Sequence, residues 1–411
     1  MTSNDSAHSA KATADKIQLG PGAARLKGAG LVGGIVCLAI AIVWGAVLGD
    51  DMRRFFHSYL FAFTYFLSFS LGALFFVLIH HLVGATWSVT TRRLAEIVTG
   101  TFPILFMVML GLAVPLLLGS KSLYLWMDHD LVQKDHILHA KAGYLNAPFF
   151  VGRMVLYFAI WIGLSRYFRK GSVDQDQSGD AAISSRLRAR SGPAMILYAL
   201  TTAWAGFDLL MSLYPHWFST IFGVYYFAGC AISVYCILAL MSFVLQRGGR
   251  LVRSISVEHY HDLGKMANAF TLFWAYIGFS QFMLIWAANI PEESTFFRSR
   301  MFTEWKWASI ALILGHFVIP FVGMMSRHVK RNPPFLAAWA VYMLLVHAFD
   351  LFWLVMPAYS PERFVFHFID LLCLAGIGGL FLFGALATAG NVKLLPVRDP
   401  RLEASLRFVN Q

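Results

Sequence analysis

A histidine and an aspartate lie three residues apart in an apolar stretch near the C-terminal end of the sequence. His347 and Asp350 belong to the segment HAFDLFWLVMP, which holds no other charged residue. At helical spacing the two side chains share one face. A carboxylate at membrane depth costs roughly 2.5–3.5 kcal/mol on insertion scales, so it needs a partner or a function. Because buried imidazole and carboxylate groups can exchange protons near neutral pH, the pair is a candidate for taking protons from a quinol or for a short proton relay.

A third ionisable residue is predicted to join this pair. Gly315-His316 corresponds to Gly152-Arg153 in an earlier apolar run if a gap of two residues is allowed. We therefore expect His316, His347 and Asp350 to converge between neighbouring helices. The alternative interpretation is a hydrogen-bonded polar cluster that only fixes helix packing.

Arg153 and Asp208 form a second candidate couple. Each lies about five residues, or roughly 8 Å, from the outer end of its predicted span. The sequence predicts an ion pair, with a structural role or a role in binding or proton transfer as the two alternatives. Asp370, three residues after His367, is predicted to form an interfacial pair with that histidine; with His347 and Asp350 it is also a candidate for quinone binding.

Metal and covalent cofactor sites find little support. The four cysteines lie in apolar runs and form no C-x-x-C motif, which disfavours iron–sulfur ligation, covalent haem attachment and a disulfide framework. His80 and His81 are expected to cap a helix end at the lipid headgroups. The segment 119–147, rich in His and Asp, is interpreted as an amphipathic surface segment, and no metal site is predicted.

The composition defines the class of protein. The sequence is 58% hydrophobic and only 13% charged, whereas soluble domains hold about 25% charged residues. The sequence therefore predicts an all-α polytopic membrane protein. A net charge of +11 does not indicate nucleic-acid binding here, since basic residues collect in the cytoplasmic loops of membrane proteins.

Ten apolar runs are long enough to cross a bilayer. A polar N-terminal tail (1–27) and C-terminal tail (390–411) flank a transmembrane domain (28–389), and the polar loop 171–190 is expected to be flexible. With the N-terminus inside, inner segments hold 23 Lys and Arg residues and outer segments hold 10. This bias predicts that both termini are cytoplasmic. The predicted spans are 29–48, 56–83, 97–118, 148–166, 193–213, 219–245, 267–290, 307–325, 335–356 and 364–389.

The sequence contains a predicted internal duplication. The segment around Asp208 recurs 142 residues later around Asp350, with the same flanking Phe, Leu and Pro, and the basic helix end after Ser165 recurs after Ser326. Helices 2–5 (56–166 and 193–213) then correspond to helices 6–9 (219–356) as parallel repeats, two four-helix bundles with helices 1 and 10 outside them. Secondary transporters more often contain inverted repeats.

Two segments also resemble a known family. The stretch KAGYLNAPFF (141–150) with Arg153, and the stretch MSLYPHWFST (211–220), resemble signature segments of NrfD-like (polysulfide-reductase-like) membrane subunits of bacterial alternative complex III, of the ActF type. The resemblance covers essentially the whole chain, including ten helices in two four-helix bundles.

The resemblance implies a subunit of a respiratory or photosynthetic quinol:cytochrome c (or other periplasmic acceptor) oxidoreductase in the bacterial cytoplasmic membrane. Implied partners are a multihaem cytochrome c subunit, an iron–sulfur subunit, a second NrfD-like subunit, small membrane subunits and membrane lipid. Haem and iron–sulfur centres are expected only in partner subunits. This subunit is expected to support assembly and proton transfer, and quinone or menaquinone is the only cofactor that it is expected to bind. The remaining alternatives are a secondary transporter with coupling carboxylates at Asp208 and Asp350, and a purely structural scaffold.

Overall fold

The chain folds into a bundle of helices that cross a membrane ten times. The computed structural model describes residues 15–410, and those residues form helices without any strand. Ten helices are long and apolar enough to span a membrane, which confirms the predicted polytopic all-α class. The spans are α2 (Gly22–Val47), α3 (Arg53–Leu82), α4 with α5 (Val89–Thr99, Phe102–Leu117), α8 (Ala147–Ser178), α9 (Ala181–Leu209, followed by the turn η2, Met211–Leu213), α10 (Phe222–Arg247), α11 (Val257–Ala288), α13–η3–α14 (Trp305–Leu312, Ile313–Val318, Ile319–Gly323), α16 (Pro333–Tyr359) and α17 (Phe368–Ala389).

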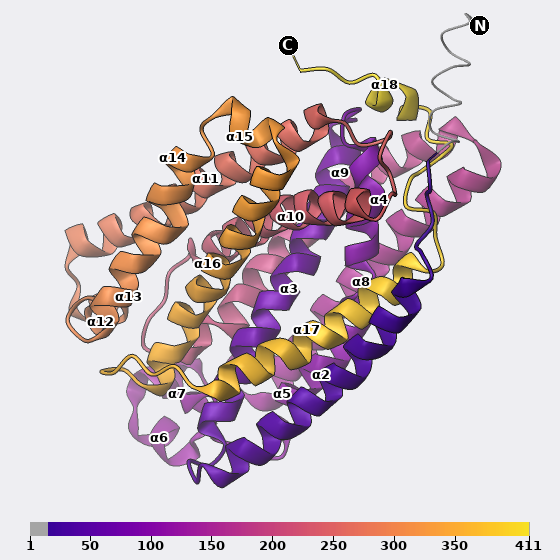
Figure 1. Cartoon of the computed structure of the whole chain (residues 1–411). Coiled ribbons are helices and arrows are strands. Elements are labelled where there is room, and N and C mark those ends of the chain that lie inside the picture. The colour runs from indigo at the N-terminus through magenta and orange to yellow at the C-terminus, as the bar shows by residue number, and fades with distance from the viewer. Residues whose placement is uncertain (1–14, 411) are drawn as a thin grey trace, which may run out of the picture.

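Short helices complete the ends of the bundle. The turn η1 (Leu125–Met127), α6 (His129–Lys134) and α7 (His136–Lys141) form one cap, and α12 (Pro291–Met301) lies between α11 and α13. At the opposite end, α15 (Arg327–Arg331) joins α14 to α16, and α18 (Leu402–Leu406) lies near the C-terminus (Figure 1).

The segment 171–190, expected to be a flexible loop, is helical. Helix α8 continues to Ser178, and Gly179 ends it with φ of +71°, a conformation that glycine adopts without steric cost. The Asp180 side chain then caps α9 by accepting a hydrogen bond from the Ala182 N–H. Gln175 donates to the Asp180 carbonyl at 3.0 Å, which closes the turn. Polar helix ends carry no apolar signal, so the sequence pattern placed the end of α8 too early and the start of α9 too late.

The helices pack into two groups that meet along α3 and α10. Helices α3, α4, α5, α8 and α9 contact one another, as do α10, α11, α16 and the α13–η3–α14 span, and α3 also contacts α10 and α16. Most of α3 and α10 is buried. This grouping agrees with the two predicted bundles, whereas their origin by duplication stays a prediction.

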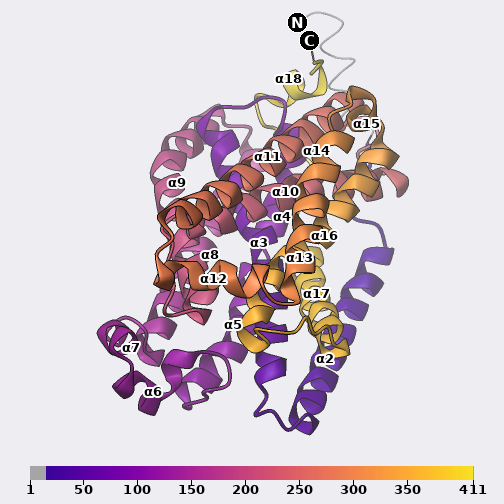
Figure 2. The same cartoon turned by 90° about the vertical axis from the view of Figure 1, so that its left-hand side faces the viewer.

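Helices α2 and α17 lie side by side outside these groups, as predicted (Figures 1 and 2). Their backbones approach closely where glycines face each other. A Cβ atom on Gly34 would lie 2.8 Å from the Gly376 carbonyl oxygen, so only glycine permits this contact. Inside a membrane the hydrophobic effect does not drive helices together. Small residues at a helix interface let the backbones approach closely, so that van der Waals packing can hold the helices together.

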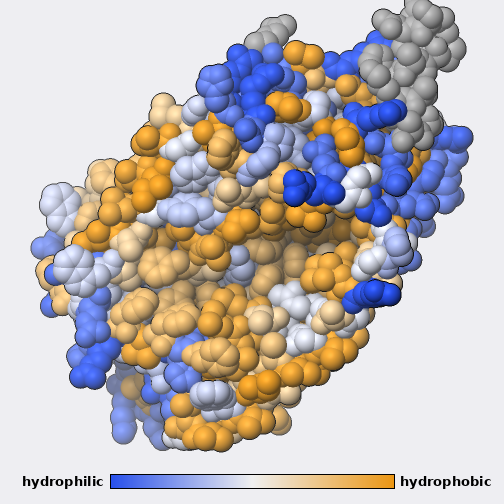
Figure 3. Space-filling view, viewed as in Figure 1, coloured by the Kyte–Doolittle hydropathy of each residue, from blue (hydrophilic) through white to orange (hydrophobic). Residues whose placement is uncertain are grey.

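The described chain ends meet at one end of the bundle. The Leu394 N–H donates to the Ile17 carbonyl at 2.7 Å, and the first and last described segments lie at the same end of the bundle in Figures 1 and 2. Residues 1–14 of the predicted N-terminal tail lie outside the described residues, and α2 begins at Gly22, earlier than expected. A broad apolar surface occupies the middle of the face in Figure 3, with hydrophilic residues gathered at the end near the termini.

Candidate functional site

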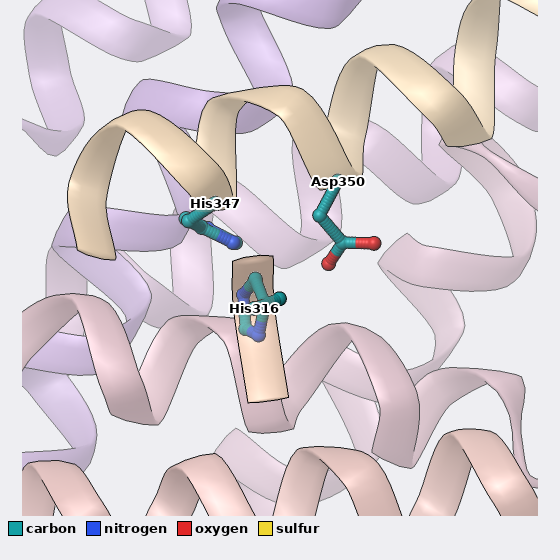
Figure 4. Close-up of side chains that lie close together, drawn as sticks. All are labelled: His316, His347 and Asp350. Atoms are coloured by element: carbon teal, nitrogen blue, oxygen red, sulfur yellow. The ribbon is translucent and has the colours of Figure 1, made fainter. Parts of the chain in front are cut away.

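His316, His347 and Asp350 converge inside the second group of helices, as the sequence predicted. One ligand atom of each lies within 4.8 Å of the others, and all three side chains are buried. His347 and Asp350 extend from α16, and His316 approaches from the neighbouring span (Figure 4). We call these three residues the His–His–Asp cluster.

A π-helical turn positions His316. The span that carries it runs as α-helix from Trp305, changes to the π turn η3 over Ile313–Val318, and returns to α-helix at Ile319. The Tyr342 hydroxyl donates to the Gly315 carbonyl at 2.9 Å within this turn. π turns inside α-helices are rare and are frequent at functional sites. The two-residue gap needed to align Gly315-His316 with Gly152-Arg153 was the sequence signal for this irregular turn.

Asp350 is held by two neutral donors from other helices. The Tyr225 hydroxyl of α10 donates to its Oδ1 at 2.6 Å, and the Trp274 Nε1–H of α11 donates to its Oδ2 at 3.1 Å. Within residues 15–410 no cation forms an ion pair with this carboxylate. Its charge is therefore stabilised by dipoles alone, so that the site accommodates a charged or a protonated carboxyl.

His347 presents one free imidazole nitrogen. Its Nε2 lies 2.9 Å from the Ser68 Oγ of α3, and that hydroxyl already donates to the Tyr65 carbonyl at 2.6 Å. Because a serine hydroxyl has a single proton, the neutral His347 donates through Nε2 and keeps its lone pair on Nδ1. Nδ1 has no partner among the described side chains and main chain. Gly229 makes room for the ring: a Cβ there would lie 2.5 Å from the His347 Cε1.

His316 is held by stacking, not by hydrogen bonds. Its ring centroid lies 4.0 Å from that of Trp274, the same indole that donates to Asp350. Neither of its two ring nitrogens finds a partner in the part of the chain that the structure describes. The cluster therefore holds three buried imidazole nitrogens without a partner among the described residues. In the neutral rings two of them carry a lone pair that can accept a proton, and the third, on His316, carries an N–H. The donor set also suits a divalent metal ion.

Arg153 and Asp208 form the predicted ion pair in the first group of helices. Two parallel hydrogen bonds of 2.9 Å join the guanidinium of α8 to the carboxylate of α9, and the Tyr157 hydroxyl adds a third at 2.9 Å. The guanidinium also stacks on the Tyr144 ring at 3.8 Å. Asp208 is thus fully paired, unlike Asp350 at the corresponding position of the second group.

The segments 141–150 and 211–220 meet above this pair. The Lys141 Nζ donates to the Pro215 carbonyl at 2.6 Å, and His216 contacts Asp135 at 2.6 Å. Both contacts join the α6–α7 cap to the chain that follows α9. The cap covers the end of the first group of helices.

His367 and Asp370 contact each other at the start of α17, where the Asp370 carboxylate accepts a hydrogen bond from the His367 main-chain N–H at 2.8 Å, but they do not form the predicted interfacial pair of side chains. Asp370 is buried and forms an ion pair with Arg54 of α3, and it also accepts a hydrogen bond from Ser58 at 2.6 Å. The His367 side chain instead caps α17 by accepting from the Ile369 N–H. Arg54 was missed because it precedes the predicted start of its span. Asp370 does not join the His–His–Asp cluster.

His80 and His81 also differ from the expectation. Both lie in the last turn of α3, as expected, but their side chains are buried within the protein. Near them the polar end of α4 forms a buried ionic network, in which Arg92 pairs with Asp399 at 2.5 Å and Arg93 pairs with Asp176 at 2.8 Å. No pattern in the sequence indicated this network, because its members come from three separate segments: α4, α8 and the C-terminal stretch.

The aromatic partners of the cluster were not predicted either. Tyr225 and Trp274 lie in apolar helices of a chain with 15 Tyr and 12 Trp residues, so no pattern distinguishes them. No family model matches this sequence, and a search of curated proteins finds no match. The site is thus interpreted from its own geometry.

Proposed function

We propose that this chain is a membrane subunit of a quinol-oxidising complex and that its His–His–Asp cluster transfers protons inside the membrane. The observation that supports this most is the set of buried nitrogens without partners beside a carboxylate without a cation. A structural polar cluster satisfies its own hydrogen bonds, since each unmet buried polar group costs about 1–3 kcal/mol. Buried imidazole nitrogens without hydrogen-bond partners lower the stability of the fold, and their presence beside Asp350 therefore favours a role in proton exchange.

The chemistry of the cluster follows from its contacts. Asp350 accepts a proton on a carboxylate oxygen and becomes a neutral acid, still held by Tyr225 and Trp274. That acid passes the proton to an imidazole nitrogen of His347 or His316, within the 4.8 Å limit of the cluster or through one bridging water. The imidazolium releases the proton from its other nitrogen. Asp350 then returns to its carboxylate, whereas the imidazole is left in the opposite neutral tautomer and must return a proton between its two nitrogens, by a ring flip or through water, before the next transfer.

The rest of the assignment rests on the resemblance of the segments 141–150 and 211–220. We propose that electrons pass through haem and iron–sulfur centres of partner subunits, while a second NrfD-like subunit carries the main quinol site. The chain then lies in the bacterial cytoplasmic membrane with both termini in the cytoplasm, as the basic-residue bias favours. A secondary transporter is the less favoured alternative, because Arg153 neutralises Asp208, and of the two carboxylates proposed for coupling only Asp350 then lacks a cation among the described residues.

Substitutions in the assembled complex test the proposal. Asp350→Asn and His347→Gln preserve shape but each removes a titrating group. If the relay is obligatory, the rate of quinol oxidation should fall by about 100-fold; otherwise the pH profile of that rate should shift. Asp174→Asn and His139→Gln, at exposed positions, are matched controls. If the cluster variants assemble and oxidise quinol with an unchanged rate and pH profile, the proposed role is wrong.

A further inference from the structure

An apolar cavity of about 620 Å³ lies beside the His–His–Asp cluster, between α11, α12, α13 and α16. Its inner wall includes Tyr225 and Trp274, the two donors to Asp350. Its outer wall includes Phe279 and Ile313, whose side chains are 62% and 56% exposed on the apolar surface of the spans. Since these residues face lipid, the cavity is reached from the membrane.

The cavity wall contains a buried arginine without an acidic partner. Arg300 of α12 is 0% exposed and donates to neutral oxygens: the Phe296 carbonyl at 2.9 Å and the Tyr214 hydroxyl at 2.8 Å. Its guanidinium lies 3.6 Å from the Phe296 ring, and its Nε has no hydrogen-bond partner. Among residues 15–410 no carboxylate forms an ion pair with it. A buried charge in a protein is normally paired, so Arg300 leaves an uncompensated positive field on the cavity.

A second cation lies at the rim. Lys306 lines the same cavity, is exposed, and has no acidic partner in the described residues. The neighbouring Trp307 is 68% exposed. Exposed tryptophan and lysine at the end of a span are typical of the level of the lipid headgroups. No Asp or Glu lines the cavity. The site therefore combines an apolar interior open to lipid with two positive charges near headgroup level.

We propose that this cavity binds an anionic phospholipid. Its phosphate contacts Lys306 at the rim within the positive field of Arg300, and one acyl chain enters the apolar interior. A small soluble anion would not fill the apolar interior, and a zwitterionic lipid would bring its own cation next to both positive residues. The bound chain lies against Tyr225 and Trp274 and keeps water from that side of Asp350. This inference does not depend on the proposed function.

Lipid binding to the full chain, purified in detergent and delipidated, tests the proposal. Native mass spectrometry is used with dioleoylphosphatidylglycerol, dioleoylphosphatidylcholine and oleate. We expect retention of phosphatidylglycerol over phosphatidylcholine, and a loss of this preference by about fivefold in Lys306→Gln and again in Arg300→Met. Arg298→Gln, an exposed position on the same helix that does not line the cavity, should retain the preference.

A cavity-filling variant distinguishes this site from general surface binding. Ala275→Phe places a ring inside the cavity and should abolish retention of phosphatidylglycerol while both cations remain. Lys306→Gln changes an exposed residue, so the test holds even if Arg300→Met fails to fold. Equal retention of both phospholipids, an unchanged preference in Lys306→Gln, or retention of oleate alone would each overturn the proposal.

Discussion

The Arg153 guanidinium and the Asp208 carboxylate face each other across α8 and α9 through two hydrogen bonds of equal length, 2.9 Å. Asp350, which the predicted repeat aligns with Asp208, has no such cation among the described residues and lies beside two imidazoles. The two buried carboxylates therefore have opposite surroundings. In one the charge is neutralised and fixed, and in the other it is left open to protons.

Removal of either member of the Arg153–Asp208 pair should impair folding. Each single change, Arg153→Met or Asp208→Leu, leaves a buried charge and should cost about 3–5 kcal/mol of stability. The double variant should recover part of this loss, because no unpaired charge remains. Thermal unfolding in detergent for the four members of a double-mutant cycle measures the coupling. Strictly additive losses would show that the two side chains do not interact.

Gly229 tests the position of His347. A methyl group at residue 229 would collide with the imidazole edge, so Gly229→Ala should displace the ring. A misplacement of about 1 Å can cost roughly 100-fold in rate. We therefore expect slow quinol oxidation in assembled complexes, measured beside a native gel that reports assembly. Gly152→Ala, on a helix surface with open space around it, is the control and should retain the wild-type rate. A wild-type rate in Gly229→Ala would contradict the relay.

The sequence predicted those features that depend on apolar runs and helical spacing. Ten spans follow from runs of apolar residues, and the depth of Arg153 and Asp208 predicted their pairing. The convergence of His316 with His347 and Asp350 followed from the repeat. Each of these follows from the depth of a residue in its own helix and from the packing of consecutive spans against each other, both of which can be inferred from sequence order.

Other features depend on which helix faces which. Asp370 was assigned to His367, its neighbour in sequence, whereas its partner Arg54 lies 316 residues away. Tyr225 and Trp274 were not distinguishable from other aromatic residues in apolar helices. The helical segment 171–190 lacks apolar periodicity because it extends beyond the lipid. Long-range pairing and polar helix extensions leave little trace in a single sequence.

The Arg92–Asp399 ion pair should stop stabilising the fold at acid pH. Burial raises the pKa of Asp399, but the charge of Arg92 and its hydrogen bond outweigh burial and hold the pKa of Asp399 below its ordinary value of 3.8. A carboxyl with a depressed pKa in the folded state stabilises that state above 3.8 and loses this effect as the pH falls through the folded pKa. Asp399→Asn should therefore lower the melting temperature at pH 7, and the difference from wild type should shrink below pH 3.8. A difference that stays constant between pH 7 and pH 3 would contradict an ionised Asp399.

The orientation of the chain can be tested at two exposed positions at opposite ends of the bundle. Asp174 lies on the polar extension of α8, at the end where the termini meet, and His139 lies on the cap helix α7. The bias of 23 basic residues against 10 predicts that the first end faces the cytoplasm. In a background without the four native cysteines, which lie in membrane spans, His139→Cys should react with an impermeant maleimide added to intact cells. Asp174→Cys should react only after the membrane is opened. Labelling of Asp174→Cys from outside would show that the topology is the reverse of the predicted one. The lipid site at Lys306 would then lie in the cytoplasmic leaflet.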